Sequence, residues 1–324
     1  MQALLLDNGA ARLTRVDDPR PAPGEALIQV RLTGLCRTDL ELARGYMDFS
    51  GIPGHEFVGE VVQVNRPDGF PGGEWMGRRV VGEINAGCGR CAWCRGGLER
   101  HCPDRTVLGL AGRSGSLAEY LTLPLSNLHP VPGGVSDRAA VFTEPLAAAL
   151  EILEQAHVPP GARVLVVGDG KLGLLAARVL QIHGCELLCL GSHEAKLDLL
   201  RRWGLRALHH QNFAGKRDFD LAVEASGSPG GFETARAALK PRGTLVLKST
   251  YHGALTLNAA LLVIDEITVL GSRCGPFAPA LRLLEAGLVA VEELVSAAYP
   301  LSRAEEAFEH AARPEALKVL VTVP

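Results

Sequence analysis

The feature that most constrains the fold of this chain is a glycine-rich turn between an apolar run and a helical pattern. The run RVLVV (163–167) leads into the motif G-x-G-x-x-G, formed by Gly168, Gly170 and Gly173, which opens the helical pattern KLGLLAARVLQIHG. In such a turn the first two glycines permit a tight bend and a close approach of the backbone to a ligand, and the third lets helix and strand pack closely. The helix N-terminus then faces a phosphate group. This context predicts a dinucleotide-binding unit.

The second half of the chain continues the alternation of strands and helices. Short apolar runs (ELLCLG, DLAVEAS, GTLVLKS and ITVLGS) are mostly separated by helix-like segments. Such alternation indicates a parallel sheet with helices on both faces, so we expect an α/β fold with a doubly wound sheet. The N-terminal part instead shows short alternating strands bounded by Gly and Pro, and a strand pattern, LKVLVTV, returns near the end. We therefore predict a dinucleotide-binding domain at 132–271 and a β-rich domain made of 1–131 and 272–324.

Composition excludes several classes of function. The 324 residues are 47% hydrophobic, and 33 Lys and Arg balance 36 Asp and Glu to a formal net charge of −3. This charge argues against a nucleic-acid partner or a polybasic membrane surface. The start, MQALLLDNGAARL, has no cationic leader, and the apolar stretches are far shorter than the ~20 residues of a membrane helix. We expect a cytoplasmic protein whose eight cysteines are not disulfides.

Four of the cysteines form a cluster in the segment GCGRCAWCRGGLERHC. Cys88, Cys91, Cys94 and Cys102 have the spacing C-x2-C-x2-C-x7-C. Four thiolates satisfy tetrahedral zinc and leave no open position, so the loop 88–102 is predicted to hold a structural zinc. The alternatives are four unrelated cysteines, a redox pair, or a zinc ribbon for nucleic acid, whose two knuckles are usually farther apart.

Three residues that are far apart in the sequence suggest a second metal site. Cys36 lies in GLCRTDLEL, His55 in GIPGHEFVGEV and Glu144 in TEPLA. A thiolate, an imidazole and a carboxylate form a three-ligand set that leaves a fourth position for water or substrate. Taken singly, each has an ordinary alternative, since a lone cysteine packs in cores and a lone histidine is often a structural residue.

The order of these motifs resembles one known family. GLCRTD, PGHEFVGEV, the four-cysteine loop, TEPLA and GDGKLG occur in the order seen in zinc-dependent medium-chain dehydrogenases, which include alcohol, sorbitol and threonine dehydrogenases. The similarity runs from Met1 to Val323. It implies a GroES-like catalytic domain beside a Rossmann domain, and two zinc ions per chain. By this resemblance Cys36, His55 and Glu144 hold the catalytic zinc, and the glutamate is more similar to the polyol, threonine and glucose dehydrogenase branch.

The resemblance also implies roles for neighbouring residues. Glu56 can approach the zinc or accept a hydrogen bond beside it, and Asp39 fits as the carboxylate that orients His55. Thr38 is the candidate first proton relay, because a hydroxyl both accepts and donates a hydrogen bond. Many alcohol dehydrogenases have a relay histidine three residues later, where this chain has Glu41. Either Glu41 or water would then pass the proton to solvent.

The implied activity is hydride transfer between a small alcohol or polyol, or its carbonyl product, and NAD or NADP, with zinc as Lewis acid. The alternatives are a non-catalytic NAD(P)-binding relative and a zinc-independent quinone or enoyl reductase of the same superfamily. The intact set of Cys36, His55 and Glu144 argues against both. The fold itself specifies no substrate. The resemblance also implies a homodimer or homotetramer, formed by pairing of the ITVLGS strand across a two-fold axis.

The residues that follow the apolar run ELLCL, the second predicted strand of the dinucleotide-binding domain, bear on the choice between NAD and NADP. NAD-binding folds carry an acidic residue about 20 positions past the glycine motif, where it binds the adenosine ribose 2′-OH. Here that position is Gly191, and Ser192 and His193 follow, so we expect NADP to be favoured, although Glu194 could reach toward the ribose. The predicted cofactor-binding residues are Gly168, Gly170, Lys171, Leu172, Gly173, Gly191, Ser192, His193 and Arg273, with Arg37 and Lys318 near the pyrophosphate by resemblance.

Overall fold

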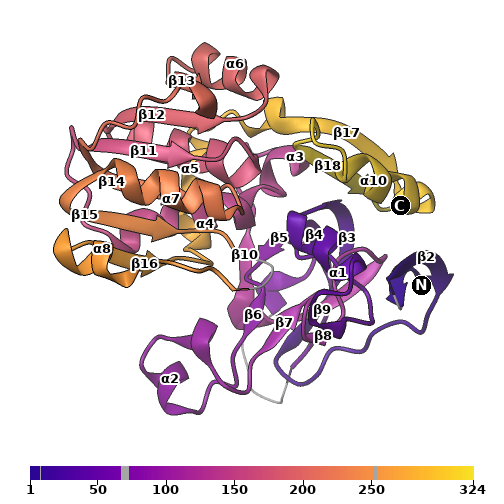
Figure 1. The fold of residues 1–324 in the computed structure, drawn as a ribbon. Coiled ribbons are helices and arrows are strands. Elements are labelled where there is room, and N and C mark those ends of the chain that lie inside the picture. Colours follow the sequence, from indigo (N-terminus) through magenta and orange to yellow (C-terminus); the bar gives the residue numbers. More distant parts are fainter. Residues whose placement is uncertain (8, 67–72, 251–253) are drawn as a thin grey trace. The chain divides into compact units, whose positions relative to one another are not determined.

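The computed structural model describes residues 1–7, 9–66, 73–250 and 254–324 (Figure 1). The chain forms two compact units. Unit 1 combines Met1–Glu144 with Phe277–Pro324, and unit 2 is Pro145–Pro276. The helices of the described residues include none that is long and apolar enough to cross a bilayer.

Unit 1 is built mainly of antiparallel strands. Among the described residues, a seven-stranded sheet has the order β10-β5-β4-β3-β18-β17, and β9 also pairs with β3. A two-stranded sheet joins β1 and β2, and a small sheet joins β6, β7 and β8. The strands are β1 (Gln2–Asp7), β2 (Ala10–Arg15), β3 (Glu25–Gly34), β4 (Glu56–Asn65), β5 (Arg79–Gly82), β6 (Asn85–Ala86), β7 (Thr106–Leu108), β8 (Gly112–Arg113), β9 (Tyr120–Pro124), β10 (Leu128–Pro130), β17 (Val295–Pro300) and β18 (Lys318–Thr322).

Burial in unit 1 follows the alternation of its strands. In β3, Ile28 and Val30 are buried and the intervening side chains are more exposed, so one face of the strand packs on the core. The strand β18 pairs antiparallel with β3, which places the C-terminal segment inside this sheet and not in the parallel one. The helices of unit 1 are α1 (Arg37–Ala43), α2 (Ala92–Arg95), α3 (Asp137–Ala140), α9 (Phe277–Glu285) and α10 (Ala304–Ala311), and α4 (Thr143–Gln155) begins there.

Unit 2 contains the parallel sheet that the sequence predicts. Its order in the described residues is β13-β12-β11-β14-β15-β16, and each neighbouring pair is parallel. The strands are β11 (Arg163–Val167), β12 (Glu186–Gly191), β13 (Arg206–His209), β14 (Phe219–Glu224), β15 (Leu239–Leu247) and β16 (Thr268–Gly271). The helices between them are α5 (Lys171–Ile182), α6 (Glu194–Arg202), α7 (Pro229–Ala238) and α8 (Ala259–Ile264). Apolar residues such as Leu165, Leu190 and Phe232 form the core beside this sheet.

The two units meet in sequence at different residues from those expected. The predicted domain boundaries lie after residues 131 and 271, whereas the compact units of the structure divide after Glu144 and after Pro276. Residues 132–144 belong with unit 1 because α3 packs there. Its Asp137 forms ion pairs with Arg79 and Arg31, whose side chains come from β5 and β3.

Candidate metal centres and cofactor loop

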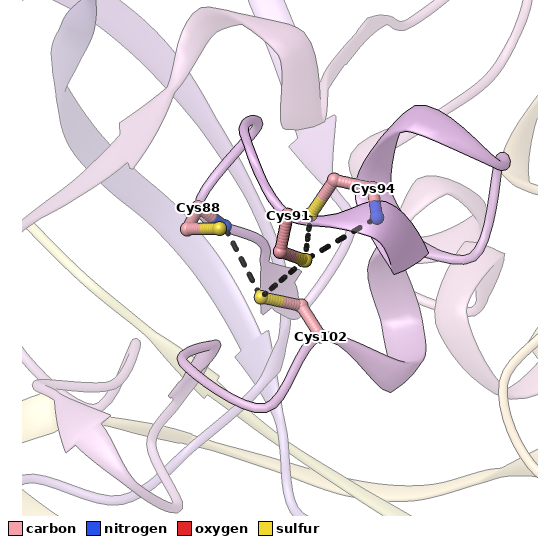
Figure 2. Close-up of side chains that lie close together, drawn as sticks. All are labelled: Cys88, Cys91, Cys94 and Cys102. Atoms are coloured by element: carbon pink, nitrogen blue, oxygen red, sulfur yellow. Dashed lines mark hydrogen bonds between the residues drawn. The ribbon is translucent and has the colours of Figure 1, made fainter.

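The four-cysteine loop brings its sulfur atoms together (Figure 2). The Sγ atoms of Cys88, Cys91, Cys94 and Cys102 all lie within 4.8 Å of one another. Cys91 Sγ is 3.5 Å from Cys94 Sγ and 3.8 Å from Cys102 Sγ. These separations are too long for a disulfide, and all four cysteines are free thiols.

This arrangement fits tetrahedral zinc. With Zn–S bonds of about 2.3 Å, the edge of an S4 tetrahedron is about 3.8 Å, which matches the observed sulfur separations. The turn at α2 supplies part of the geometry, since Cys91 caps this helix and accepts the N–H of Cys94. Backbone N–H groups from residues 90 and 91 lower the pKa of the Cys88 thiol to about 6, which favours the thiolate. The donor set and its spacing are those of a structural site.

The second candidate site lies where β3, α1 and β4 meet. Gly34 at the end of β3 pairs with Glu56 at the start of β4, so the residues just beyond this pair, Cys36 and His55, are brought together. The ligand atoms of Cys36, His55 and Glu56 lie within 4.8 Å of one another. Cys36 is partly exposed, whereas His55 and Glu56 are buried. Sequence reasoning predicts the first two as ligands.

Asp39 ties the ligand-bearing segments together. Its carboxylate accepts the backbone N–H of Cys36 at 2.8 Å and that of Gly54 at 3.1 Å, and it lies 3.5 Å from His55 Nδ1. Burial alone would lower the pKa of His55, but the charge of Asp39 raises it well above its ordinary value. Burial would raise the pKa of Asp39, but His55 and the two N–H groups hold it below its ordinary value.

A buried ion pair adjoins the site. Lys318 of β18 bonds through Nζ to Glu56 Oε2, and both side chains are almost completely buried. The Lys318 ammonium also lies 5.4 Å from the centre of the Phe142 ring. Gly34 leaves room for this pair, since a Cβ there would lie 2.8 Å from Glu56 Oε2. By resemblance Lys318 is expected near the pyrophosphate, and the structure places it beside Glu56.

The charges of these groups fit a divalent cation. A divalent ion bound to Cys36 as a thiolate, with Glu56 and Asp39 close by, would add positive charge to the Lys318 ammonium in this largely buried group. Without a metal Asp39 favours the charged His55 ring, and a bound cation would instead take His55 as the neutral imidazole, which completes an S, N and O donor set typical of zinc. Asp39, which lies 3.5 Å from His55 Nδ1, would then be the acceptor for the second ring N–H, as carboxylates commonly are beside metal-bound histidines.

The remaining predicted residues of unit 1 have mixed placements. Glu144 lies in the first turn of α4 and is partly exposed, and within the described residues it is not part of the close group around Cys36. Thr38 Oγ1 lies 3.9 Å from Cys36 Sγ. The exposed Arg37 forms an ion pair with Glu41 at 2.8 Å, and Glu41 also pairs with Arg44 at 3.0 Å.

In unit 2 the glycine motif has the predicted local structure. Gly168 directly follows β11 with φ +123°, a conformation that favours glycine, and a Cβ there would lie 2.5 Å from the carbonyl oxygen of Ala225. A Cβ on Gly173 would overlap the carbonyl oxygen of Gly168, whereas Gly170 faces open space. Gly170 is also the N-cap of α5, so the helix N-terminus is accessible to an anion.

The other predicted cofactor residues of unit 2 lie at the start of α5, at the carboxyl end of β12 and after β16. Lys171 and Leu172 lie in the first turn of α5 and are partly exposed, and Arg273 is exposed after β16. Gly191, Ser192 and His193 follow the carboxyl end of β12, where ligands bind in open parallel sheets. Sequence reasoning missed Asp169, which lies between the first two glycines of the motif and contacts Ser192 and His193. An acidic residue at that position was the available signal.

Two family descriptions match most of the chain. The alcohol dehydrogenase GroES-like domain matches residues 22–133, and the zinc-binding dehydrogenase family matches residues 172–286. A sorbitol dehydrogenase of Halalkalibacterium halodurans is 30% identical over 99% of this chain and 99% of its own length. The chain belongs to the zinc-dependent medium-chain dehydrogenase family.

Solved structures of an alcohol dehydrogenase and of a zinc-binding dehydrogenase have the same fold. Alcohol dehydrogenase TADH from Thermus sp. ATN1 superposes with a TM-score of 0.90 at 29% identity, and the match covers 100% of both chains. A zinc-binding dehydrogenase from Sinorhizobium meliloti 1021 bound to NADP has a TM-score of 0.88 at 25% identity, covering 99% of this chain and 98% of the other. The predicted fold class and family are thus confirmed.

Proposed function

We propose that this zinc-dependent dehydrogenase interconverts an alcohol or polyol and its carbonyl product, with NAD(P) as hydride carrier and catalytic zinc beside Cys36 and His55. The observation that carries the proposal is the ligand group around Cys36 and His55 in unit 1, in a chain whose unit 2 bears a complete glycine motif. The similarity to a sorbitol dehydrogenase and to an alcohol dehydrogenase supports this substrate class.

Two carboxylates are candidates for the third catalytic zinc ligand. The sequence favours Glu144, whereas the position of Glu56, with a carboxylate oxygen within 4.8 Å of the donor atoms of Cys36 and His55, supports Glu56. We propose Glu56 as the third ligand and keep Glu144 as the alternative. Zinc retention against a chelator separates them, since Glu56→Gln should lose zinc from this site and Glu144→Gln should keep it.

The residues of this chain would position substrate and move a proton. When bound, zinc supplies a Lewis acid for the substrate oxygen, and the nicotinamide ring supplies the hydride acceptor. Thr38, near Cys36, can accept the hydroxyl proton and donate its own onward. Glu41, three residues along α1 and held between two arginines, would guide that proton to solvent.

Finer features extend the proposal. We propose two zinc ions per chain, one in each cysteine-containing group. The absence of disulfides among the eight cysteines supports a reducing, cytoplasmic location. An exposed apolar surface on α8 and β16 supports homo-oligomerisation. It includes Val263 at 76% exposure and Ile264 at 74%, and β16 lies at the edge of the parallel sheet.

The test combines metal content with turnover. Zinc is measured per chain, and primary alcohols, secondary alcohols, polyols, aldoses and threonine are screened with NAD+ and NADP+. Cys36→Ser and His55→Ala should lose one zinc and nearly all turnover while the protein remains folded. Cys185→Ser, outside both ligand groups, is the matched control and should retain both. Near-normal kcat/KM in the Cys36 and His55 variants would support a zinc-independent reductase, and no turnover by the wild type would support a non-catalytic relative.

A further inference from the structure

Asp169 contacts the segment that binds the adenosine ribose in folds of this kind. It is the residue between the first two glycines of the motif, and its side chain is only 10% exposed. Its Oδ2 atom accepts the backbone N–H of Ser192 at 2.8 Å and that of His193 at 2.7 Å. His193 Nδ1 lies 3.1 Å from the same oxygen. A carboxylate from the glycine loop therefore reaches across to the carboxyl end of β12.

The space around Gly191 fits this arrangement. A Cβ at position 191 would lie 2.5 Å from Asp169 Oδ2 and 2.6 Å from Asp169 Cβ, so a side chain there would collide with Asp169. In NAD-binding folds the acidic residue that accepts the ribose 2′-OH stands at the end of this strand. Here glycine stands at that position, and the carboxylate that fills the adjoining space belongs to Asp169.

The same contacts occupy the hydrogen-bond donors that a 2′-phosphate would need. A phosphate at this turn would be bound by the N–H groups of Ser192 and His193 and by the His193 ring. All three face Asp169. These hydrogen bonds outweigh the effect of burial and hold the pKa of Asp169 below its ordinary value, so the carboxylate is charged at neutral pH. A second anion would meet a fixed negative charge and occupied donors.

We propose that Asp169 makes this dehydrogenase selective for NAD over NADP, by accepting the 2′-OH of the adenosine ribose and excluding a 2′-phosphate. The inference rests on the proposed use of NAD(P) and reverses the preference expected from Gly191, Ser192 and His193. Position 191 is a glycine and carries no carboxylate of its own. The structure supplies one from position 169.

Direct binding of adenosine fragments tests the proposal without turnover. Calorimetry measures the dissociation constants of 5′-AMP and 2′,5′-ADP, which differ in the 2′-phosphate, and fluorescence titration does the same for NADH and NADPH. The wild type should bind the non-phosphorylated member of each pair more tightly, by about tenfold or more, because close like charges are strongly unfavourable. Asp169→Asn and Asp169→Ser should each reduce this ratio by about tenfold, mainly through tighter binding of the 2′-phosphorylated member.

Two further variants sharpen the test. Asp198→Asn removes an exposed carboxylate of α6 that pairs with Arg201, and it should leave the ratio unchanged. Glu194→Gln removes the other carboxylate near the turn, and a large change there with none in Asp169→Asn would overturn the proposal. Circular dichroism and melting temperature establish that each variant is folded. The ratio of dissociation constants in the wild type tests the selectivity even if a variant fails to fold. Tighter wild-type binding of 2′,5′-ADP and NADPH would overturn the selectivity alone, whereas no binding of any of the four probes would overturn the proposed function as well.

Discussion

The Asp39 carboxylate lies 3.5 Å from His55 Nδ1 and accepts the backbone N–H of Cys36 at 2.8 Å, so one side chain adjoins both candidate zinc ligands. Its second oxygen accepts the N–H of Gly54, the residue before His55. A single buried carboxylate therefore links the start of α1 to the residue before His55.

Asp39→Asn should weaken zinc binding at this site. The amide keeps the shape but loses the charge that favours and orients the His55 ring, and loss of such a partner typically costs about 10–100-fold in metal affinity or activity. Competition with a chromophoric chelator measures the affinity, and kcat/KM should fall in parallel. Asp17→Asn, at an exposed position, is the control. Unchanged zinc affinity in Asp39→Asn would show that Asp39 has no such role.

The buried pair of Glu56 and Lys318 makes a prediction about stability. Lys318→Met leaves the Glu56 charge buried without its cation, and breaking such a pair costs about 3–5 kcal/mol. The double variant Glu56→Gln/Lys318→Met should recover a large part of this loss in urea denaturation of the zinc-free protein. Lys240→Met breaks an ion pair whose lysine is half-exposed, so it should change stability by no more than ~1 kcal/mol. Equal losses in the two lysine variants would contradict this account.

Cys91→Ser should remove one zinc ion per chain and lower the melting temperature, while the remaining zinc stays with the Cys36 site. A structural zinc contributes directly to folding, and three thiolates no longer complete its tetrahedron. Inductively coupled plasma mass spectrometry gives the stoichiometry, and calorimetry gives the melting temperature. A variant that keeps two zinc ions would exclude the four-cysteine assignment.

Gly191→Asp should destabilise the protein when made alone. The new Cβ would lie 2.5 Å from Asp169 Oδ2, and forcing atoms into such a filled space typically costs about 1–3 kcal/mol. Combined with Asp169→Gly, the same substitution moves the carboxylate to the end of β12 and should restore both stability and the preference for NAD. Thermal unfolding and NADH titration compare the two variants. If Gly191→Asp alone is as stable as the wild type, the packing described here is incorrect.

Ile264→Glu should reduce the molar mass measured by light scattering. A charge on the exposed apolar surface of α8 disfavours burial of that surface against a second copy. Leu208→Glu is a matched control, because Leu208 is also an exposed apolar residue but lies on β13 at the opposite edge of the same sheet. A wild-type protein that is already monomeric at micromolar concentration would exclude the proposed assembly.

Local patterns predicted much of this fold. The apolar run before Gly168 and the helical pattern after it identify β11 and α5, because both signals come from neighbouring residues. The four cysteines are equally local, lying in one short loop. Cys36 and His55 are farther apart, and there the family motifs supplied what spacing alone left open.

Sequence patterns did not predict contacts between side chains that are far apart along the chain. Nothing near Lys318 in the sequence indicates that it neutralises Glu56, because that pairing depends on β18 joining β3. Asp169 was hidden for a similar reason, since its partners follow a different strand. The resemblance favoured Glu144 as a ligand, whereas strand register brought Glu56 to Cys36 and His55.

The pairing of β18 with β3 also affects how the protein is made. Lys318 and Glu56 are separated by 262 positions, so translation produces the carboxylate long before its cation. The strands of unit 2 are contiguous in sequence and can assemble during translation, but the sheet of unit 1 is completed only when β17 and β18 have been made. Such a long sequence separation slows folding. The nascent chain must therefore keep the edge of β3 and the neighbouring Glu56 carboxylate unpaired until residues 318–322 leave the exit tunnel.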